Sequence, residues 1–403
     1  MTLPGERRRR RKRAFLSAGI LALSGIVGGG VLAASNTWIG LSVGLAGLVA
    51  ALVVLYRPGG VPILVYHSIS PDASWLPWST NTSVRPEVFR CHLQTLKNGG
   101  WTVKSTLDIV RDRQAGKRIN DKTVVLQFDD GYLDNLVFAA PILREFSMPA
   151  TFFASLDFIE QGKAIREDND KLGPADWTGY MTVAELSLMD ADPLFDIEAH
   201  GVNHARVPIS DKPVEQLTEA NWLRHAPLAW AYDSKNKARW FEAETPPPPL
   251  FIGEMVPEND SALSGRWWND GETETEVAYV QRVGHALNRS RKELGEILGK
   301  DVVIFAWPFD RYCPVSVAAA KEAGFVAVTG GRGENRPEED PTILSRVHIH
   351  DRAFGRGPLW LEGLALRARV NSASGRLVWH FLVVLAARIR SRRFGRPGYG
   401  PVS

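Results

Sequence analysis

Cysteine is scarce in this chain, since Cys91 and Cys313 are the two cysteines among 403 residues. Two cysteines offer no disulfide framework and no cysteine-based metal site. A metal ion would therefore need nitrogen and oxygen ligands. The shortage says little about the cellular compartment, because a domain of this size buries a substantial core without disulfide bonds.

Excess positive charge is also missing from most of the chain. Seven consecutive basic residues run from Arg7 to Arg13, and five more lie between Arg388 and Arg396. Without these twelve, residues 14 to 387 hold 36 basic and 44 acidic residues, although the whole chain has a net charge of +3. The net negative charge of residues 14 to 387 argues against nucleic acid as a partner.

Two uncharged apolar runs, 15–34 and 37–56, follow the arginines. Each is about long enough to cross a bilayer as a helix, so we expect a basic segment at 1–13 and a two-helix membrane anchor at 14–57. A cleaved signal peptide ending near Val31-Leu32-Ala33 is the alternative, but the second run argues against it. A further alternative is that only one of the two runs spans the membrane.

The most informative stretch is 124–131, an apolar run that ends in two adjacent carboxylates and a glycine. Successive side chains of a strand point to opposite faces, so Asp129 and Asp130 share a pocket only if the strand stops there. Gly131 supplies that stop, and sites usually lie at the carboxyl ends of parallel strands. One carboxylate could bind a cation while the other acts as a base. Alone, the Asp-Gly pair could also be an ordinary turn.

Two histidines, His200 and His204, lie about seventy residues later, at the end of a second short predicted strand, 196–200. Spaced four apart at a strand end, they can point the same way. Together with Asp130 they would supply three protein ligands and leave a position for water, which is typical of catalytic zinc.

Several motifs now resemble a known family. Phe128-Asp129-Asp130-Gly131, His200-x-x-x-His204 and Trp307-Pro308-Phe309 are similar to the first three motifs of the polysaccharide deacetylases, also called the NodB-homology or carbohydrate esterase family 4 proteins. The segments 61–69, 139–143 and 149–153 resemble the branch that de-N-acetylates biofilm poly-N-acetylglucosamine.

The resemblance implies a role for each matching residue. Asp129 would be the general base and His67 the acid that protonates the leaving amine, while the backbone N–H of Phe309 would help to stabilise the oxyanion. The metal, zinc with nickel or cobalt as alternatives, would be held by Asp130, His200 and His204.

Four positions depart from the family pattern. Gln127, Ala199, Gly201 and Asp310 replace a threonine, a serine, a threonine and a glycine, respectively. None of these changes removes a ligand, but each alters the surroundings of the site. His348 and His350 could be further ligands, although alternation along a half-buried strand explains them more simply.

Strands and helices alternate between residues 61 and 350, which predicts a parallel α/β architecture, and the resemblance implies a distorted (β/α) barrel. Strands are expected at 63–67, 124–130, 151–155, 196–200, 303–308, 325–329 and 345–349. Helices are expected at 86–98, 105–115, 135–146, 182–190, 276–298 and 314–323.

We therefore expect a catalytic domain at 58–352, interrupted by a tryptophan-rich insertion at 205–274, and an amphipathic, basic tail at 353–403. The insertion's tryptophans could stack on sugar rings or pack the insertion onto the barrel. The stretch 377–387 is too short to span and is expected to lie on an anionic membrane surface.

The first hypothesis is a membrane-anchored, metal-dependent deacetylase of an N-acetylhexosamine exopolysaccharide, working beside its synthesis machinery. The family resemblance places such a domain outside the cytoplasmic membrane. A two-helix hairpin with cytoplasmic arginines would instead return it to the cytoplasm, which suits a second hypothesis, a deacetylase of a lipid-linked sugar. A third, a non-catalytic glycan-binding or assembly protein, is disfavoured by the intact site residues.

Overall fold

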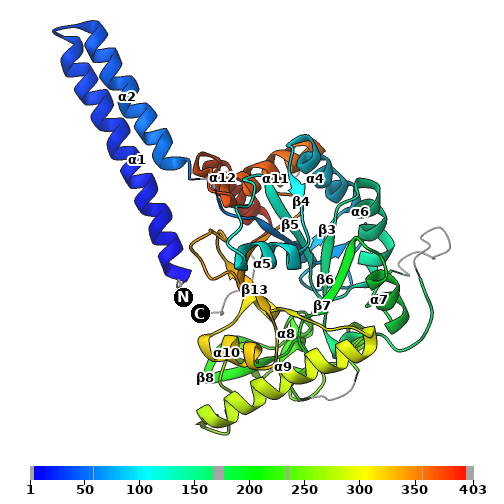
Figure 1. The fold of residues 1–403 in the computed structure, drawn as a ribbon. Helices are drawn as coiled ribbons and strands as arrows, with labels where there is room; N and C mark the ends of the chain where they lie inside the picture. The colour runs from blue at the N-terminus through cyan, green and yellow to red at the C-terminus, as the bar shows by residue number, and fades with distance from the viewer. Residues whose placement is uncertain (1–3, 58, 167–176, 233–235, 356, 396–403) are drawn as a thin grey trace.

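The computed structural model describes residues 4–57, 59–166, 177–232, 236–355 and 357–395, and its centre is a barrel of parallel strands (Figure 1). In order, the strands are β1 (Ile63–Tyr66), β14 (Ile343–His348), β13 (Ala327–Arg332), β12 (Ile304–Ala306), β7 (Phe195–Ala199), β6 (Ala150–Ala154) and β5 (Thr123–Phe128). Pairing of β1 with β5 closes the barrel, with Ile63 opposite Val125 and Tyr66 opposite Phe128. The seven predicted strands and the (β/α) barrel are confirmed.

Parallel barrel strands are covered on both faces, so they have near-continuous apolar sequences. All six side chains of β5 are buried. Phe128 stacks on Tyr66 and on Phe152 of β6, with ring centroids 5.4 and 4.6 Å apart. Three shorter strands, β2 (Ser68–Ile69), β3 (Ser83–Val84) and β4 (Thr102–Val103), lie beside the barrel.

The predicted helices are also present. They are α4 (Pro86–Asn98), α5 (Thr106–Gln114), α6 (Ala140–Phe146) after one π-helical turn (Asn135–Ala139), α7 (Val183–Asp190), α9 (Glu276–Leu298) and α10 (Pro314–Glu322). The longest, α9, buries Val283, Leu287 and Leu294 at helical spacing. The Thr275 side chain caps its first turn, and Gly299 ends it with φ 67°.

The insertion at 205–274 contains regular structure that its sequence did not indicate. An antiparallel pair, β8 (Arg206–Gln216) and β9 (Met255–Ser261), frames α8 (Trp222–Ala229), and a small pair follows, β10 (Trp268–Asn269) with β11 (Glu272–Thr273). Residues 233–235 lie outside the described residues. The insertion lies over the carboxyl ends of the barrel strands. The histidine motif follows the end of β7, and β8 begins directly after that motif.

The N-terminal segment forms an antiparallel hairpin of α1 (Pro4–Ala33) and α2 (Thr37–Leu55), while residues 1–3 lie outside the described range. Glycines let the two backbones touch: a Cβ on Gly25 would lie 2.7 Å from Gly47 Cα, and one on Gly29 2.6 Å from Gly40 O. Both helices are long and apolar enough to cross a membrane. A signal sequence would pass the same test, so membrane anchoring stays a prediction.

The hairpin's turn points away from the barrel, so the start of α1 and the end of α2 lie on the barrel's side (Figure 1). Helix α11 (Leu359–Ala373) packs against α4, and α12 (His380–Phe394) follows it. Along α12, Phe381, Leu385 and Ile389 are exposed and spaced four apart. That stripe fits the surface-lying helix expected for the tail, whose last residues, 396–403, are outside the described range.

Candidate active site

The two adjacent carboxylates share one site because β5 ends at Phe128. Asp130 and Gly131 both adopt left-handed backbone, with φ 76° and 71°. The strand ends before the two carboxylates, as predicted from Gly131, so they no longer have to point to opposite faces. Any side chain at position 131 would also be crowded, because its Cβ would lie 3.3 Å from the Cβ of Ala154.

The histidines follow β7 in the same way. His200 comes directly after Ala199, its backbone N–H donates to Ala154 O, and its carbonyl accepts from the Ser155 hydroxyl at 2.9 Å. His204 has φ 47°, another left-handed residue. Non-glycine residues held in this region cost free energy and cluster at functional sites.

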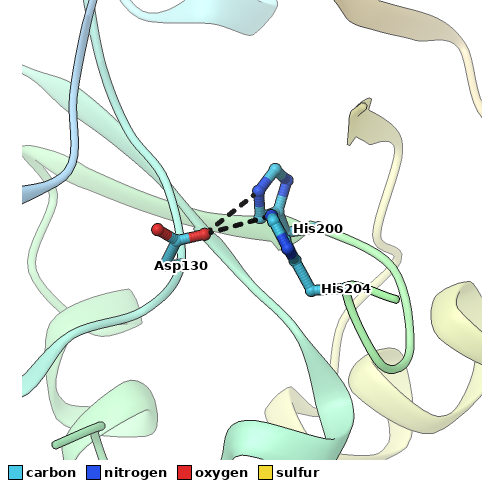
Figure 2. A group of neighbouring side chains, drawn as sticks. All are labelled: Asp130, His200 and His204. Carbon is cyan, nitrogen blue, oxygen red and sulfur yellow. Dashed lines mark ion pairs between the residues drawn. The ribbon is translucent and has the colours of Figure 1, made fainter. Parts of the chain in front are cut away.

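Asp130, His200 and His204 converge (Figure 2). The Oδ1 atom of Asp130 lies 3.3 Å from His200 Nε2 and 3.4 Å from His204 Nε2, and the three ligand atoms all lie within 4.8 Å of one another. His200 Nδ1 lies 3.0 Å from Ala306 O, so a proton on Nδ1 leaves Nε2 free to face Asp130. Metal-binding histidines are typically held by such a carbonyl.

The charges of these three residues suit a divalent cation. Burial favours a neutral Asp130, but the hydrogen bond to His200 and the nearby histidines hold its pKa well below the usual range. Burial lowers the pKa of His204 to about 4, so its ring is neutral at pH 7. Burial opposes protonation of His200 too, yet Asp129 and Asp130 raise its pKa. One ionised carboxylate and two imidazole nitrogens form a zinc-type donor set.

Asp129 is 1% exposed and is held by an arginine that sequence reasoning missed. Arg346, in β14, donates from Nη1 to Asp129 Oδ1 at 2.7 Å. The other carboxylate oxygen, Oδ2, lies 3.9 Å from Nε2 of both His67 and His200. Arg346 therefore fixes the carboxylate and leaves one oxygen facing the histidines.

Asp310, the residue in place of the family's glycine, completes this network. Its Oδ1 accepts from Arg346 Nε at 2.8 Å and Nη2 at 2.5 Å, and its Oδ2 contacts His348 Nε2. Arg346 and His348 alternate along β14, so they share a face. His350 instead contacts Asn81 O. The departure at 310 thus supplies a half-buried partner for two site residues.

His67 reaches the site although it follows directly after β1. Its carbonyl accepts from Asn135 Nδ2 at 2.8 Å, and the next residue, Ser68, donates to Asp134 Oδ2 at 2.6 Å. Both partners lie just beyond the Asp-Asp turn, so the two strand ends are tied together. Burial lowers the pKa of His67, while Asp130 and Asp129 oppose that shift.

These residues line one cavity of about 520 Å³. Phe309, φ 59°, sits in its wall with its ring centroid 4.3 Å from that of His204. The structure brings together all six predicted site residues: His67, Asp129, Asp130, His200, His204 and Phe309. Their individual roles stay predictions.

The insertion's tryptophans lie in different parts of the structure. Trp230 lines the cavity, whereas Trp222 packs in a separate apolar cluster of the insertion. Trp240 stacks on Trp78, another cavity residue, with centroids 5.3 Å apart. The cavity wall therefore includes aromatic faces of the kind that sugar rings contact.

Comparison with known proteins agrees with these motifs. Residues 116–241 match the family described as polysaccharide deacetylase. Bacillus subtilis YxkH, whose name assigns it to the polysaccharide deacetylases, is 32% identical over 155 residues, 38% of this chain and 47% of that protein. The match thus spans about half of the relative's length.

Two solved structures share the fold. A de-N-acetylase from Aggregatibacter actinomycetemcomitans has a TM-score of 0.51 and 20% identity, over 71% of this chain and 94% of that one. The BpsB deacetylase domain from Bordetella bronchiseptica has a TM-score of 0.50 and 19% identity, over 73% and 97%. Residues 116–241 are thus similar to the polysaccharide deacetylase family, and the chain shares its closed parallel barrel with these two solved deacetylases.

Proposed function

We propose that the chain is a metal-dependent N-deacetylase that removes acetyl groups from N-acetylhexosamine residues. The convergence of Asp130, His200 and His204 beside Asp129 carries this proposal. Release of acetate from N-acetylglucosamine oligomers by the purified, zinc-loaded protein tests it, and no release from any N-acetylated sugar would contradict it.

A divalent ion held by Asp130, His200 and His204 would lower the pKa of water and polarise the acetamide carbonyl. Zinc fits this ligand set best, although nickel and cobalt share the same preferences. Asp129 Oδ2 is the oxygen that Arg346 leaves free, so it can accept a proton from the attacking water. Phe309 lies in the cavity wall, where its backbone N–H can meet developing negative charge.

His67 is proposed to protonate the leaving amine. Replacing His67 with Asn should slow acetate release from N-acetylglucosamine oligomers by about 10²- to 10⁴-fold. Hydrolysis of 4-nitrophenyl acetate should change far less, because a nitrophenolate leaves without being protonated. Equal losses on both substrates would remove the acid role, and loss of metal from the variant would make His67 a ligand.

Two substrates remain candidates. The family description supports a polysaccharide, which with an outward-facing domain would be an exopolysaccharide met at its synthesis machinery. The hairpin supports a lipid-linked sugar on the cytoplasmic face. It places the Arg7 to Arg13 segment and the barrel on one side, and clustered arginines favour the cytoplasm. With the arginines in the cytoplasm, an outward domain would require that only one helix crosses the membrane.

The membrane face can be measured directly. If both helices cross, green fluorescent protein fused to the C-terminus of the full chain should fluoresce, and alkaline phosphatase fused there should be inactive. The reverse pattern would indicate that the catalytic domain faces outward and would favour an exopolysaccharide as the substrate. Changing Arg7 to Arg13 into glutamines is the matched control, because it should weaken the orientation preference without altering the apolar helices.

A further inference from the structure

Arg206, the first residue of β8, lies in the wall of the cavity and forms no ion pair with a carboxylate of the described residues. Its Nε and Nη2 atoms are buried and have no hydrogen-bond partner among the described residues. Its guanidinium lies 4.7 Å from the ring centroid of Phe309, which also contacts His204. The free N–H groups therefore lie near the predicted site of chemistry.

The other charges around the cavity are already matched. Arg346 is bound by Asp129 and Asp310, while Glu215 binds both Arg224, at 3.3 Å, and His225, at 3.0 Å. Of the cavity's three arginines, Arg206 is the one for which the described part of the chain shows no ion pair.

The acid that attracts Arg206 electrostatically is already paired with another arginine. Asp260 attracts Arg206, but its carboxylate is bound by Arg311 Nε at 2.9 Å and Nη2 at 2.6 Å. Burial lowers the pKa of Arg206, and Arg311 repels its charge. A contact with an aromatic ring does not satisfy N–H donors, and buried donors in native proteins almost always have a partner. No described residue supplies that partner, so a ligand in the cavity is expected to do so.

We propose that Arg206 binds an anionic group, a phosphate or a carboxylate, that the N-acetylated sugar carries near its acetamide group. The inference rests on the proposed function, because it takes the cavity as the sugar site. A guanidinium presents a planar fork of donors that matches either anion. The substrate would then be an acidic sugar: a phosphate-linked one, as on a lipid carrier, or a carboxylated residue of a polymer.

Binding of three probes tests this in the full-length, zinc-loaded protein. Calorimetry in the Asp129→Asn background, where probes should not be consumed, compares neutral N,N′-diacetylchitobiose with N-acetylglucosamine 1-phosphate and N-acetylmuramic acid. One anionic probe should bind more tightly than the neutral one. Arg206→Gln should lower the affinity for that probe by about 10- to 100-fold, the usual range for hydrogen bonds to charged groups. The affinity for the neutral probe should stay unchanged.

Matched variants separate a specific contact from the general charge of the cavity. Arg224→Gln removes an arginine from the same wall that is already paired, and it should change anion binding little. Arg206→Lys keeps the charge and should lose less affinity than Arg206→Gln, with thermal melting confirming that both fold. Preference for the phosphate probe would indicate a phosphate-linked sugar, and preference for the carboxylate probe an acidic polymer.

Equal affinity for all three probes, or equal weakening of all three by Arg206→Gln, would overturn the proposal. So would an Arg224→Gln effect as large as that of Arg206→Gln. Acetate release by the wild-type protein is measured separately. Its absence would contradict the deacetylase assignment, while the binding data would still decide the role of Arg206.

Discussion

Replacing His200 or His204 with alanine should strip the protein of its metal and of acetate release together. Each ring supplies an Nε2 atom beside Asp130 Oδ1, at 3.3 and 3.4 Å, so each change deletes one of the three proposed ligands. Loss of a supporting residue around a metal site typically costs about 10- to 100-fold in affinity, and loss of a direct ligand should cost more. Metal content of chelator-treated, reloaded protein, measured by mass spectrometry, gives the result.

His225→Ala is the matched control, because His225 lines the same cavity but pairs with Glu215. It should bind metal as the wild type does. Reloading the chelated wild-type protein with zinc, cobalt or nickel in turn would show which ion restores acetate release. Undiminished metal content in both ligand variants would contradict the assignment, whatever their activity.

The barrel could be predicted from sequence because burial on both faces leaves a simple record. Strands such as β5 are short, continuous apolar runs, and they alternate with helices such as α9 that keep helical spacing. The Asp-Asp and His-x-x-x-His motifs lie at the carboxyl ends of these runs. Since parallel strands all end on one side, the sequence also indicated that the motifs would meet.

The network around Asp129 could not be predicted in the same way. Arg346 is 217 residues away from Asp129 along the chain, and their contact depends on how the barrel closes through β1. The one signal in the sequence was the alternation of Arg346 with His348, which places both on one face of β14. Asp310 departs from the family pattern in the sequence, but its partners are set by the fold.

The β8–β9 pair was missed because its sequence lacks the pattern of a strand. Pro208 and Pro213 interrupt β8, and Pro257 interrupts β9, with register shifts at both prolines of β8. Proline cannot donate to a strand ladder, so it is confined to edges and irregular positions. Most of β8 is also exposed or half-buried, which removes the apolar alternation. The strand that carries Arg206 therefore could not be predicted from the periodicity of apolar residues.

Asp129→Asn should keep the metal and lose about 10²- to 10⁴-fold in the rate of acetate release, the usual contribution of a general base. The amide has nearly the shape of the carboxylate and can still accept from Arg346 through its oxygen. It cannot take a proton from water at the position of Oδ2. The loss should therefore appear in kcat, with little change in KM, when acetate release from N-acetylglucosamine oligomers is followed.

Asp310→Asn provides the comparison that separates chemistry from positioning. Asp310 binds the same arginine through Nε and Nη2, whereas Asp129 binds Nη1, so the Asp310 amide variant should disturb the orientation of Asp129 without removing the base. We expect a smaller loss of kcat from Asp310→Asn than from Asp129→Asn, with metal content unchanged in both. Acetate release by Asp129→Asn at the wild-type rate would make that carboxylate structural. Equal losses in the two variants would mean that Asp129 acts mainly by holding Arg346, since both changes remove one of its two anionic partners.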